Sequence, residues 1–203
     1  MEKRLRSLNY LPIKNLSLIS KTALRSFKTE GIIIKRRNFG EADRILTVFT
    51  KRLGKIQVKA VGVRRITSRR SPHVELLNLS ALTLHKGKSL PILTEAQTIE
   101  DFSLIKDSLI KVGFAYHICE LVDGLCPENQ ENGRVFDLLS EVLFRLEHEE
   151  DIASVIHEFE VELLTILGYY KPSWRFQSID TTSFIESILE RRLKSKRILP
   201  LLL

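Results

Sequence analysis

The spacing of apolar residues changes character near residue 100. Between residues 28 and 97, apolar and polar positions alternate in short runs, which is typical of β-strands. The runs cover residues 29–35, 44–50, 55–63, 79–85 and 90–98, and Gly40, Gly54 and Gly62 lie between or at the ends of them. Pro91 is expected at a strand start or edge, because it cannot donate a ladder hydrogen bond. Five short strands with a turn signal about every ten residues predict a small β-barrel.

From residue 101 onward, apolar residues recur every three or four positions, which is the period of a helix with one buried face. Helices are predicted over 102–122, 135–146, 152–167 and 181–196, with Gly124 and Pro127 after the first and Gly168 after the third. The sequence therefore predicts an α+β fold in which a five-stranded barrel precedes a helical bundle. The expected domains are a barrel over residues 27–100 and a helical domain over residues 101–203.

Residues 1–26 precede the first predicted strand and are basic. Their apolar positions are too interrupted to form the core of a secretory signal. We expect a poorly ordered extension or an overlong gene start, and the alternative is an organellar transit peptide. No apolar run approaches the ~20 residues that a membrane-spanning helix needs. The two cysteines, Cys119 and Cys126, form no C-x-x-C pair, so we expect a soluble protein of the reducing cytosol.

The net charge of +7 hides an asymmetry along the chain. Residues 1–100 hold 21 basic and 7 acidic side chains, whereas residues 101–203 hold 11 basic and 18 acidic ones. Such a distribution is typical of a half that binds a polyanion joined to a half that contacts protein. A solvated basic surface without a ligand remains the alternative.

Signatures of enzymes and cofactors are missing from the sequence. Gly87-Lys88-Ser89 resembles the end of a phosphate-binding P-loop, but Leu82 stands where that motif requires glycine. The five histidines form no H-E-x-x-H pair. We therefore predict no catalytic residue, no metal and no cofactor.

Basic clusters interrupt the barrel half. Arg36 and Arg37 close the first strand, and four arginines lie between residues 64 and 70. Such side chains neutralise phosphates without reading base identity. Aromatic residues that could stack on bases are few: Phe49 is expected in the core because it lies in an alternating strand, and Phe39 beside Gly40 is the better stacking candidate.

Several segments of the barrel half resemble one bacterial family. KTEGIII at residues 28–34, FGEADRILTVFT at 39–50 and LGK at 53–55 resemble the opening of the RecO family of recombinational repair proteins. AVGVRR at 60–65 with Ser68-Arg69 resembles its basic loop, and LTEA at 93–96 its last barrel strand. In the second half, LTILGY at 164–169 is similar to the helix end before the family's zinc-binding segment, and RLKSKRIL at 192–199 to its C-terminal signature.

The resemblance implies an OB-fold for the barrel and a non-enzymatic function. A member of this family would bind single- and double-stranded DNA, anneal complementary strands, and act with RecR and the single-strand binding protein SSB to load RecA in the RecF pathway. SSB would be engaged through its acidic, apolar C-terminal tail, for which a basic and apolar pocket is the complement. The expected location is the cytoplasm, in association with the nucleoid. Residues 170–182 contain no cysteine, so the zinc site of some family members is not expected here.

Two sets of candidate residues follow. The DNA-binding candidates are Arg36, Arg37, Phe39, Arg44, Lys55, Arg64, Arg65, Arg69 and Arg70. The alternative function is a protein-interaction adaptor whose basic surface binds an acidic partner tail without annealing DNA. The partner-binding candidates are Arg134, Arg145, Arg191, Arg192, Lys194 and Arg197.

Overall fold

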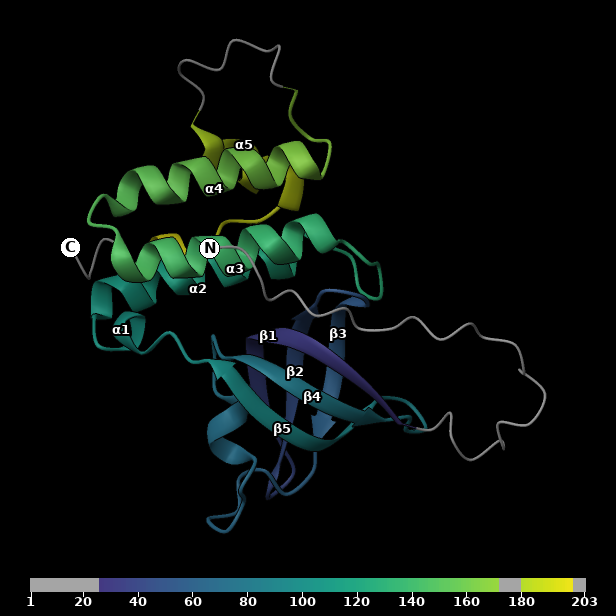
Figure 1. The fold of residues 1–203 in the computed structure, drawn as a ribbon. Helices are drawn as coiled ribbons and strands as arrows, with labels where there is room; N and C mark the ends of the chain where they lie inside the picture. The colour runs from purple at the N-terminus through teal and green to yellow at the C-terminus, as the bar shows by residue number, and fades with distance from the viewer. Residues whose placement is uncertain (1–25, 172–179, 199–203) are drawn as a thin grey trace, which may run out of the picture.

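The computed structural model describes residues 26–171 and 180–198, with side-chain exposure as far as residue 196. The extension expected over residues 1–26 lies outside this range except for Ser26, which begins the first strand. A β-barrel lies below a group of helices (Figure 1). Its strands are β1 (Ser26–Phe39), β2 (Asp43–Thr50), β3 (Gly54–Ala60), β4 (Leu79–His85) and β5 (Ile92–Glu100), and a 3-10 turn, η1 (Ser71–Val74), precedes β4.

The five strands close into a ring in the order β1-β2-β3-β5-β4. All neighbours are antiparallel except β3 and β5, which pair in parallel at Lys59 and Ile92. The Lys59 N–H donates to the carbonyl of Pro91 at 2.8 Å, so the proline lies just before β5 and serves as an acceptor. This ring confirms the predicted OB-fold barrel followed by helices.

Strand β1 is long and changes partners along its length. Residues 26–32 pair with β4, and residues 31–39 pair with β2. Its register shifts between Ile33 and Lys35, so Ile34 forms a β-bulge. Ile33 belongs to the apolar cluster of the barrel, whereas Ile32 and Ile34 belong to the cluster that includes the helices. Both faces of β1 are therefore buried at this point.

The second half folds into α1 (Ser103–Lys106), α2 (Leu109–Leu125), α3 (Gly133–His148), α4 (Ile152–Ile166), α5 (Thr181–Leu189) and α6 (Ser195–Ile198). The prediction of one helix over 102–122 is wrong, because the chain starts a new helix after Ser108. The Ser108 backbone is extended, and its side chain accepts a hydrogen bond from the N–H of Lys111.

The prediction of one helix over 181–196 is also wrong. Glu190 adopts a left-handed conformation with φ of 52° and ends α5. The N–H of Leu193, which a continuous helix would have paired with a main-chain carbonyl, donates instead to the Glu186 carboxylate at 2.8 Å. The chain therefore turns between α5 and α6.

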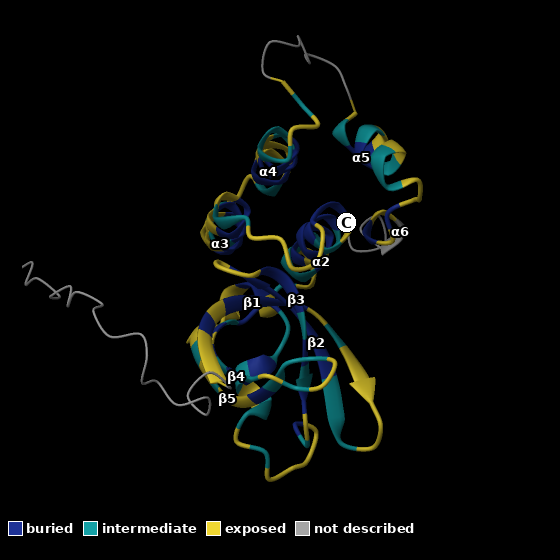
Figure 2. Cartoon of the chain, turned by 90° about the vertical axis from the view of Figure 1, so that its right-hand side faces the viewer, coloured by how far each residue is buried: buried dark blue, intermediate teal, exposed yellow. Residues whose placement is uncertain are grey.

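The barrel and the helices share one apolar core. Phe49 on β2 is fully buried, as predicted, in the same cluster as Ile118 of α2 and Leu139 of α3. Figure 2 shows this buried layer where α2 and α3 lie against β1 and β2. The helices thus cover one side of the barrel and leave its far end exposed to solvent.

Candidate nucleic-acid interface

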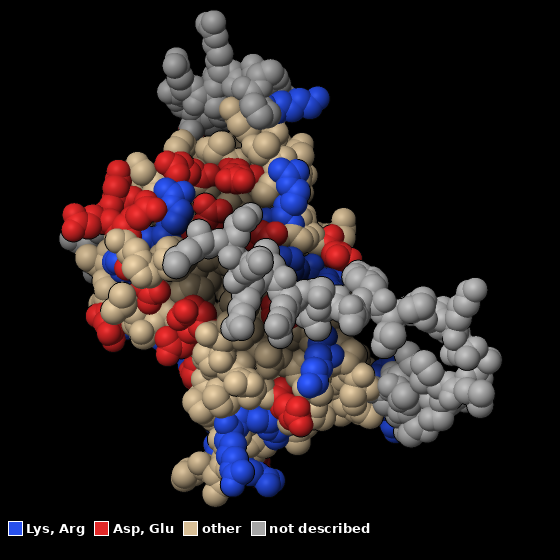
Figure 3. Space-filling view, viewed as in Figure 1, with Lys and Arg blue, Asp and Glu red and all other residues tan. Residues whose placement is uncertain are grey.

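Two connections project from the end of the barrel that lies away from the helices (Figures 1 and 2). One is the β1–β2 hairpin turn at residues 40–42, and the other is the loop of residues 61–71, which we call the basic loop. Lysine and arginine side chains gather at this end of the molecule, whereas acidic side chains gather over the helices (Figure 3). The charge asymmetry of the sequence is thus also an asymmetry in space.

Two arginines fix the basic loop to its surroundings. Arg70 donates from Nη1 to the carbonyl of Leu93 at 2.5 Å and from Nη2 to the carbonyl of Val61 at 2.8 Å. Arg64 donates from Nη1 to the carbonyls of Gly40 and Glu41 at 3.3 and 3.1 Å. Because both side chains hold the main chain in place, they position the loop as well as adding charge to it.

The start of the loop is a tight turn at Gly62, whose φ of +66° favours glycine. Its N–H donates to Asp43 Oδ1 at 2.8 Å, and the other carboxylate oxygen of Asp43 lies 3.1 Å from Lys59 Nζ. The hydrogen bond from Gly62 and the contact with Lys59 lower the pKa of Asp43. The turn is therefore stabilised by an ionised carboxylate.

An open hollow of about 470 Å³ lies inside the basic loop. Its walls include Arg65, Arg69 and Arg70, together with Ser68 and Thr94. The hydroxyl of Ser68 is buried and has no hydrogen-bond partner among the residues described. The guanidinium groups of Arg65 and Arg69 beside an open hollow are suited to an anionic oxygen ligand such as phosphate.

The candidates on β1 and β2 differ in how accessible they are. Arg37 is exposed and has no ion-pair partner within the described ranges. Arg36 and Arg44 both pair with Glu75, and their side chains are 33% and 19% exposed. Arg37 is thus the freer cation, and the charge of Arg36 and Arg44 is partly neutralised within the protein.

The structure removes Lys55 from the set of accessible candidates. Its side chain is 8% exposed, and Nζ donates to the main-chain carbonyl of Asp123 and lies 3.5 Å from the Asp123 carboxylate. Lys55 points toward the helices because they cover the outer face of the barrel at β3. It is therefore not available to a phosphate group.

Phe39 is the last residue of β1 and pairs with Asp43 of β2. Its side chain is 44% exposed, and Lys59 Nζ lies 5.0 Å from the ring centroid. The ring is therefore accessible for stacking and has a cation beside it.

Two of the partner-binding candidates, Arg191 and Lys194, line one pocket, which is described below, whereas Arg134 and Arg145 lie elsewhere. Arg145 pairs with Glu149 and Glu158 at 2.7 and 2.8 Å, and these contacts raise its pKa. Arg134 lines a separate hollow that contains Glu158 and Glu162. The Arg197 side chain lies outside the described residues.

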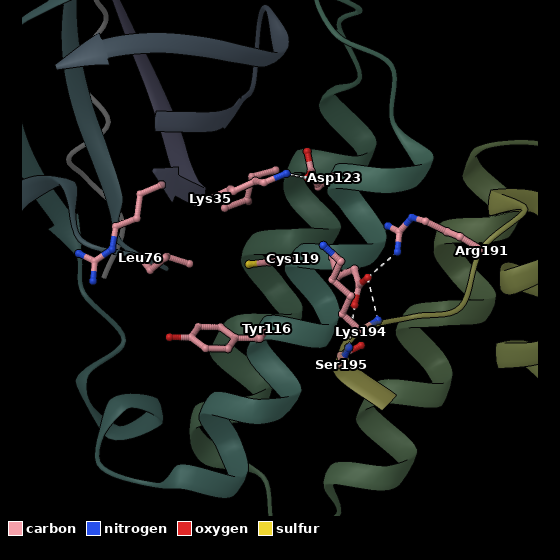
Figure 4. A pocket seen from close by; sticks show the side chains of 11 residues that line it. Lys35, Leu76, Tyr116, Cys119, Asp123, Arg191, Lys194 and Ser195 are labelled. Atoms are coloured by element: carbon pink, nitrogen blue, oxygen red, sulfur yellow. Dashed lines mark hydrogen bonds and ion pairs between the residues drawn. The ribbon is translucent and has the colours of Figure 1, made fainter. Parts of the chain in front are cut away.

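Sequence reasoning missed a pocket of about 400 Å³ between β1, α2 and the α5–α6 turn (Figure 4). Leu76, Tyr116 and Cys119 form its apolar part, and Arg191 and Lys194 lie on the side of the turn. Burial raises the pKa of the Cys119 thiol to about 12, so this group is uncharged. No local motif could indicate this pocket, because its residues come from four distant segments: β1, the segment before β4, α2 and the α5–α6 turn.

Glu120 connects α2 to the α5–α6 turn beside this pocket. Its carboxylate accepts hydrogen bonds from Arg191 Nη1 at 2.6 Å and from the N–H groups of Lys194 and Ser195 at 3.0 and 2.9 Å. Burial alone would raise the pKa of Glu120, but these hydrogen bonds outweigh it and hold the pKa at about 2.

A buried polar chain lies behind the pocket. His117 contacts Ser195 Oγ through Nδ1 and Glu160 Oε1 through Nε2, both at 2.8 Å. These are the residue types of a hydrolytic triad, but Ser195 and His117 are only 5% and 2% exposed. The Ser195 N–H also donates to the Glu120 carboxylate, which places negative charge where an oxyanion would need donors. We interpret this chain as a structural connection between α2, α4 and α6.

Residues 26–171 and 180–198 contain no cluster of three His, Cys, Asp or Glu side chains that could hold a metal ion. In the same ranges, no helix has the length and apolar character needed to cross a membrane.

Comparison with known proteins gives a consistent result over both halves. Residues 24–102 match the family described as "Recombination protein O N terminal", and residues 106–178 match "Recombination protein O C terminal". The chain is 40% identical to the DNA repair protein RecO of Dehalococcoides mccartyi over 154 residues, which is 76% of this chain and 60% of that protein.

Two further relatives carry the same name. RecO of Roseiflexus sp. is 39% identical over 145 residues, covering 71% of this chain and 51% of the relative. RecO of Alkaliphilus metalliredigens is 32% identical over 166 residues, covering 74% of this chain and 67% of the relative. The chain thus spans between 51% and 67% of the length of these three curated relatives.

Proposed function

Since this chain belongs to the RecO family of DNA repair proteins, we propose that it binds DNA through the exposed cations at the free end of its barrel. The observation that supports this proposal most directly is the basic loop, in which the exposed Arg65 and Arg69 line an open hollow. Arg37 and the ring of Phe39 extend the same surface along the end of β1.

Binding at this surface would not depend on base sequence. Guanidinium groups neutralise phosphates and release condensed counterions, so affinity should fall steeply with salt. Phe39 adds a stacking surface that accepts any base. We infer that both single- and double-stranded DNA are ligands.

Annealing follows from the same chemistry. A basic surface that screens the repulsion between two phosphate backbones, while leaving base edges free, allows complementary strands to pair. We propose that the protein acts in this way as a recombination mediator without catalysis, together with RecR and SSB, and thereby assists the loading of RecA. Its place of action would be the DNA of the nucleoid.

The test is a charge reversal that leaves the loop anchors intact. A variant with Arg37, Arg65 and Arg69 changed to Glu keeps Arg64 and Arg70, which hold the main chain. We expect single-strand affinity to fall at least about 100-fold at low salt, with a flatter salt dependence. The control changes Arg192, Lys194 and Lys196 to Glu, which is the same change in charge on the helical half. Unchanged binding in the first variant would contradict the proposal.

The adaptor function is the second candidate, and the pocket beside Tyr116 favours it. Its apolar part and its cations fit a short acidic peptide with apolar residues, such as the C-terminal tail of SSB. Titration of a labelled peptide of that kind would test this. We expect binding to be lost when Lys35 and Lys194, which line the pocket, are changed to Glu, and to be kept when Arg37, Arg65 and Arg69 are reversed.

A further inference from the structure

One apolar side chain stands out from the surface of the basic loop. Ile66 has a relative exposure of 105%, which means that it is as accessible as in an extended peptide. Among the described residues the next most exposed large apolar side chain is Leu109, at 68%. Ile66 therefore contributes nothing to the packing of the protein.

The main chain presents this side chain at the tip of a defined turn. The N–H of Ser68 donates to the carbonyl of Arg65 at 2.9 Å, so residues 65–68 form a β-turn with Ile66 as its second residue. The N–H of Arg65 in turn donates to the carbonyl of Gly62 at 3.2 Å. Because Arg64 and Arg70 anchor both sides of the loop, ordering the tip on binding costs little.

The surroundings of Ile66 indicate the kind of partner. Arg64 and Arg65 precede Ile66, and Arg69 and Arg70 follow it. A partner that contacts Ile66 is therefore favoured when it carries negative charge on either side of the contact. A nucleic acid offers phosphates for the flanking cations and stacked apolar base faces between them. DNA-binding proteins insert isoleucine, leucine or phenylalanine side chains between base steps in this way, usually beside arginines, and bend the duplex.

We propose that Ile66 is an apolar wedge that inserts between two stacked base pairs of duplex DNA bound at the basic loop. This inference rests on the proposed DNA binding and adds the mode of contact: the arginines hold the backbones, and Ile66 unstacks one base step. Flexible pyrimidine–purine steps are the preferred sites, because they unstack at the lowest cost. A base step opened in this way would assist the separation or exchange of strands during annealing.

The experiment uses the full chain and a duplex with 2-aminopurine at a central TA step. The fluorescence of this base rises when it loses its stacking partner. We expect the wild-type protein to raise the signal, Ile66→Ser to abolish the rise, and Ile66→Leu to keep it. Duplex affinity should fall roughly tenfold in Ile66→Ser, as expected when an apolar contact of this size is lost.

The control is Ile99→Ser, an isoleucine on β5 that is 50% exposed and lies outside the basic loop. It should leave the signal unchanged. If the wild-type protein binds the duplex without a fluorescence rise, or if Ile66→Ser matches wild type, the wedge is wrong while DNA binding stands. If Ile66→Ser weakens only the capture of a partner protein, the tip is a protein contact and the wedge is also wrong. Absence of any DNA binding would overturn both proposals.

Discussion

The ammonium group of Lys55 on β3 donates a hydrogen bond to the main-chain carbonyl of Asp123 on α2, and its Nζ lies 3.5 Å from the Asp123 carboxylate. Lys35 of β1 reaches the same carboxylate at 2.7 Å. Two strands of the barrel are therefore joined to one turn of α2 by charged groups at the edge of the shared apolar core. These contacts add charged links to the apolar packing that joins the helices to the barrel.

Replacing Lys55 should affect stability rather than DNA binding. Lys55→Ala removes a buried donor to a main-chain carbonyl, and we expect the free energy of unfolding to fall by about 1.5 to 3 kcal/mol. Urea unfolding followed by circular dichroism measures this change. Single-strand affinity and its salt dependence should stay within about twofold of wild type. A large loss of single-strand affinity in a folded variant would show that Lys55 contributes to DNA binding.

The position of Lys55 explains why the pattern of the barrel was predictable and its accessible surface was not. The alternation of Lys55, Gln57 and Lys59 with apolar residues indicates correctly which side chains face out of the barrel. Whether an outward position reaches solvent depends on the helices, which cover β3 at Lys55 but leave Lys59 partly exposed at the free end. That information lies in the packing of two distant segments.

The helix boundaries show the same limit. Apolar spacing predicted the extents of α3 and α4 closely, because both helices have continuous buried faces. The break after Glu190 depends on acceptors supplied by other segments, since Glu120 of α2 binds the N–H groups of Lys194 and Ser195. A local periodicity cannot reveal such a tertiary acceptor.

Arg69 and Arg70 are adjacent but should respond differently to alanine. Arg70 donates to two main-chain carbonyls, so Arg70→Ala should lower the free energy of unfolding by about 1.5 to 3 kcal/mol and also weaken DNA binding. Arg69 is exposed without a hydrogen-bond partner in the described part of the chain, so Arg69→Ala should leave stability within about 0.5 kcal/mol. Its effect should be a DNA salt slope that is smaller by about 1. Thermal unfolding measures the stability of the two variants, and fluorescence anisotropy of labelled DNA at several salt concentrations measures their binding. Equal losses of stability in the two variants would contradict the assigned roles.

Glu120 should make the docking of α5 and α6 sensitive to acid. The pKa of Glu120 is about 2 in the folded protein, below its ordinary value of 4.5. A lowered pKa means that the carboxylate stabilises the fold fully above about pH 4.5 and loses this effect as the pH falls toward 2. At neutral pH, Glu120→Gln should cost about 2 kcal/mol of unfolding free energy.

The measurement is urea unfolding of both proteins between pH 7 and pH 2. The difference between wild type and Glu120→Gln should be constant down to about pH 5 and shrink below it. Hydrogen exchange should locate the loss of protection in the α5–α6 segment. A difference that stays constant to pH 2 would show that the ionised form of Glu120 makes no special contribution.

Two glycines with left-handed backbones, Gly40 and Gly54, allow the packing between the barrel and the helical half to be tested against a control. Gly40 and Gly54 have φ values of +59° and +65°, so alanine strains the backbone at both by about 1 to 2 kcal/mol. A Cβ at Gly40 would meet nothing within 4 Å, but at Gly54 it would lie 1.8 Å from the main-chain oxygen of Gln130. Gly54→Ala must therefore push the segment after α2 away from β3, where Asn129 N–H donates to the Lys55 carbonyl at 2.8 Å.

We expect Gly54→Ala to lower the free energy of unfolding by at least about 3 kcal/mol. Gly40→Ala should lower it only by the cost of the backbone strain. Urea unfolding measures both changes. Equal destabilisation would mean that the close approach of the two segments does not contribute to the stability of the fold.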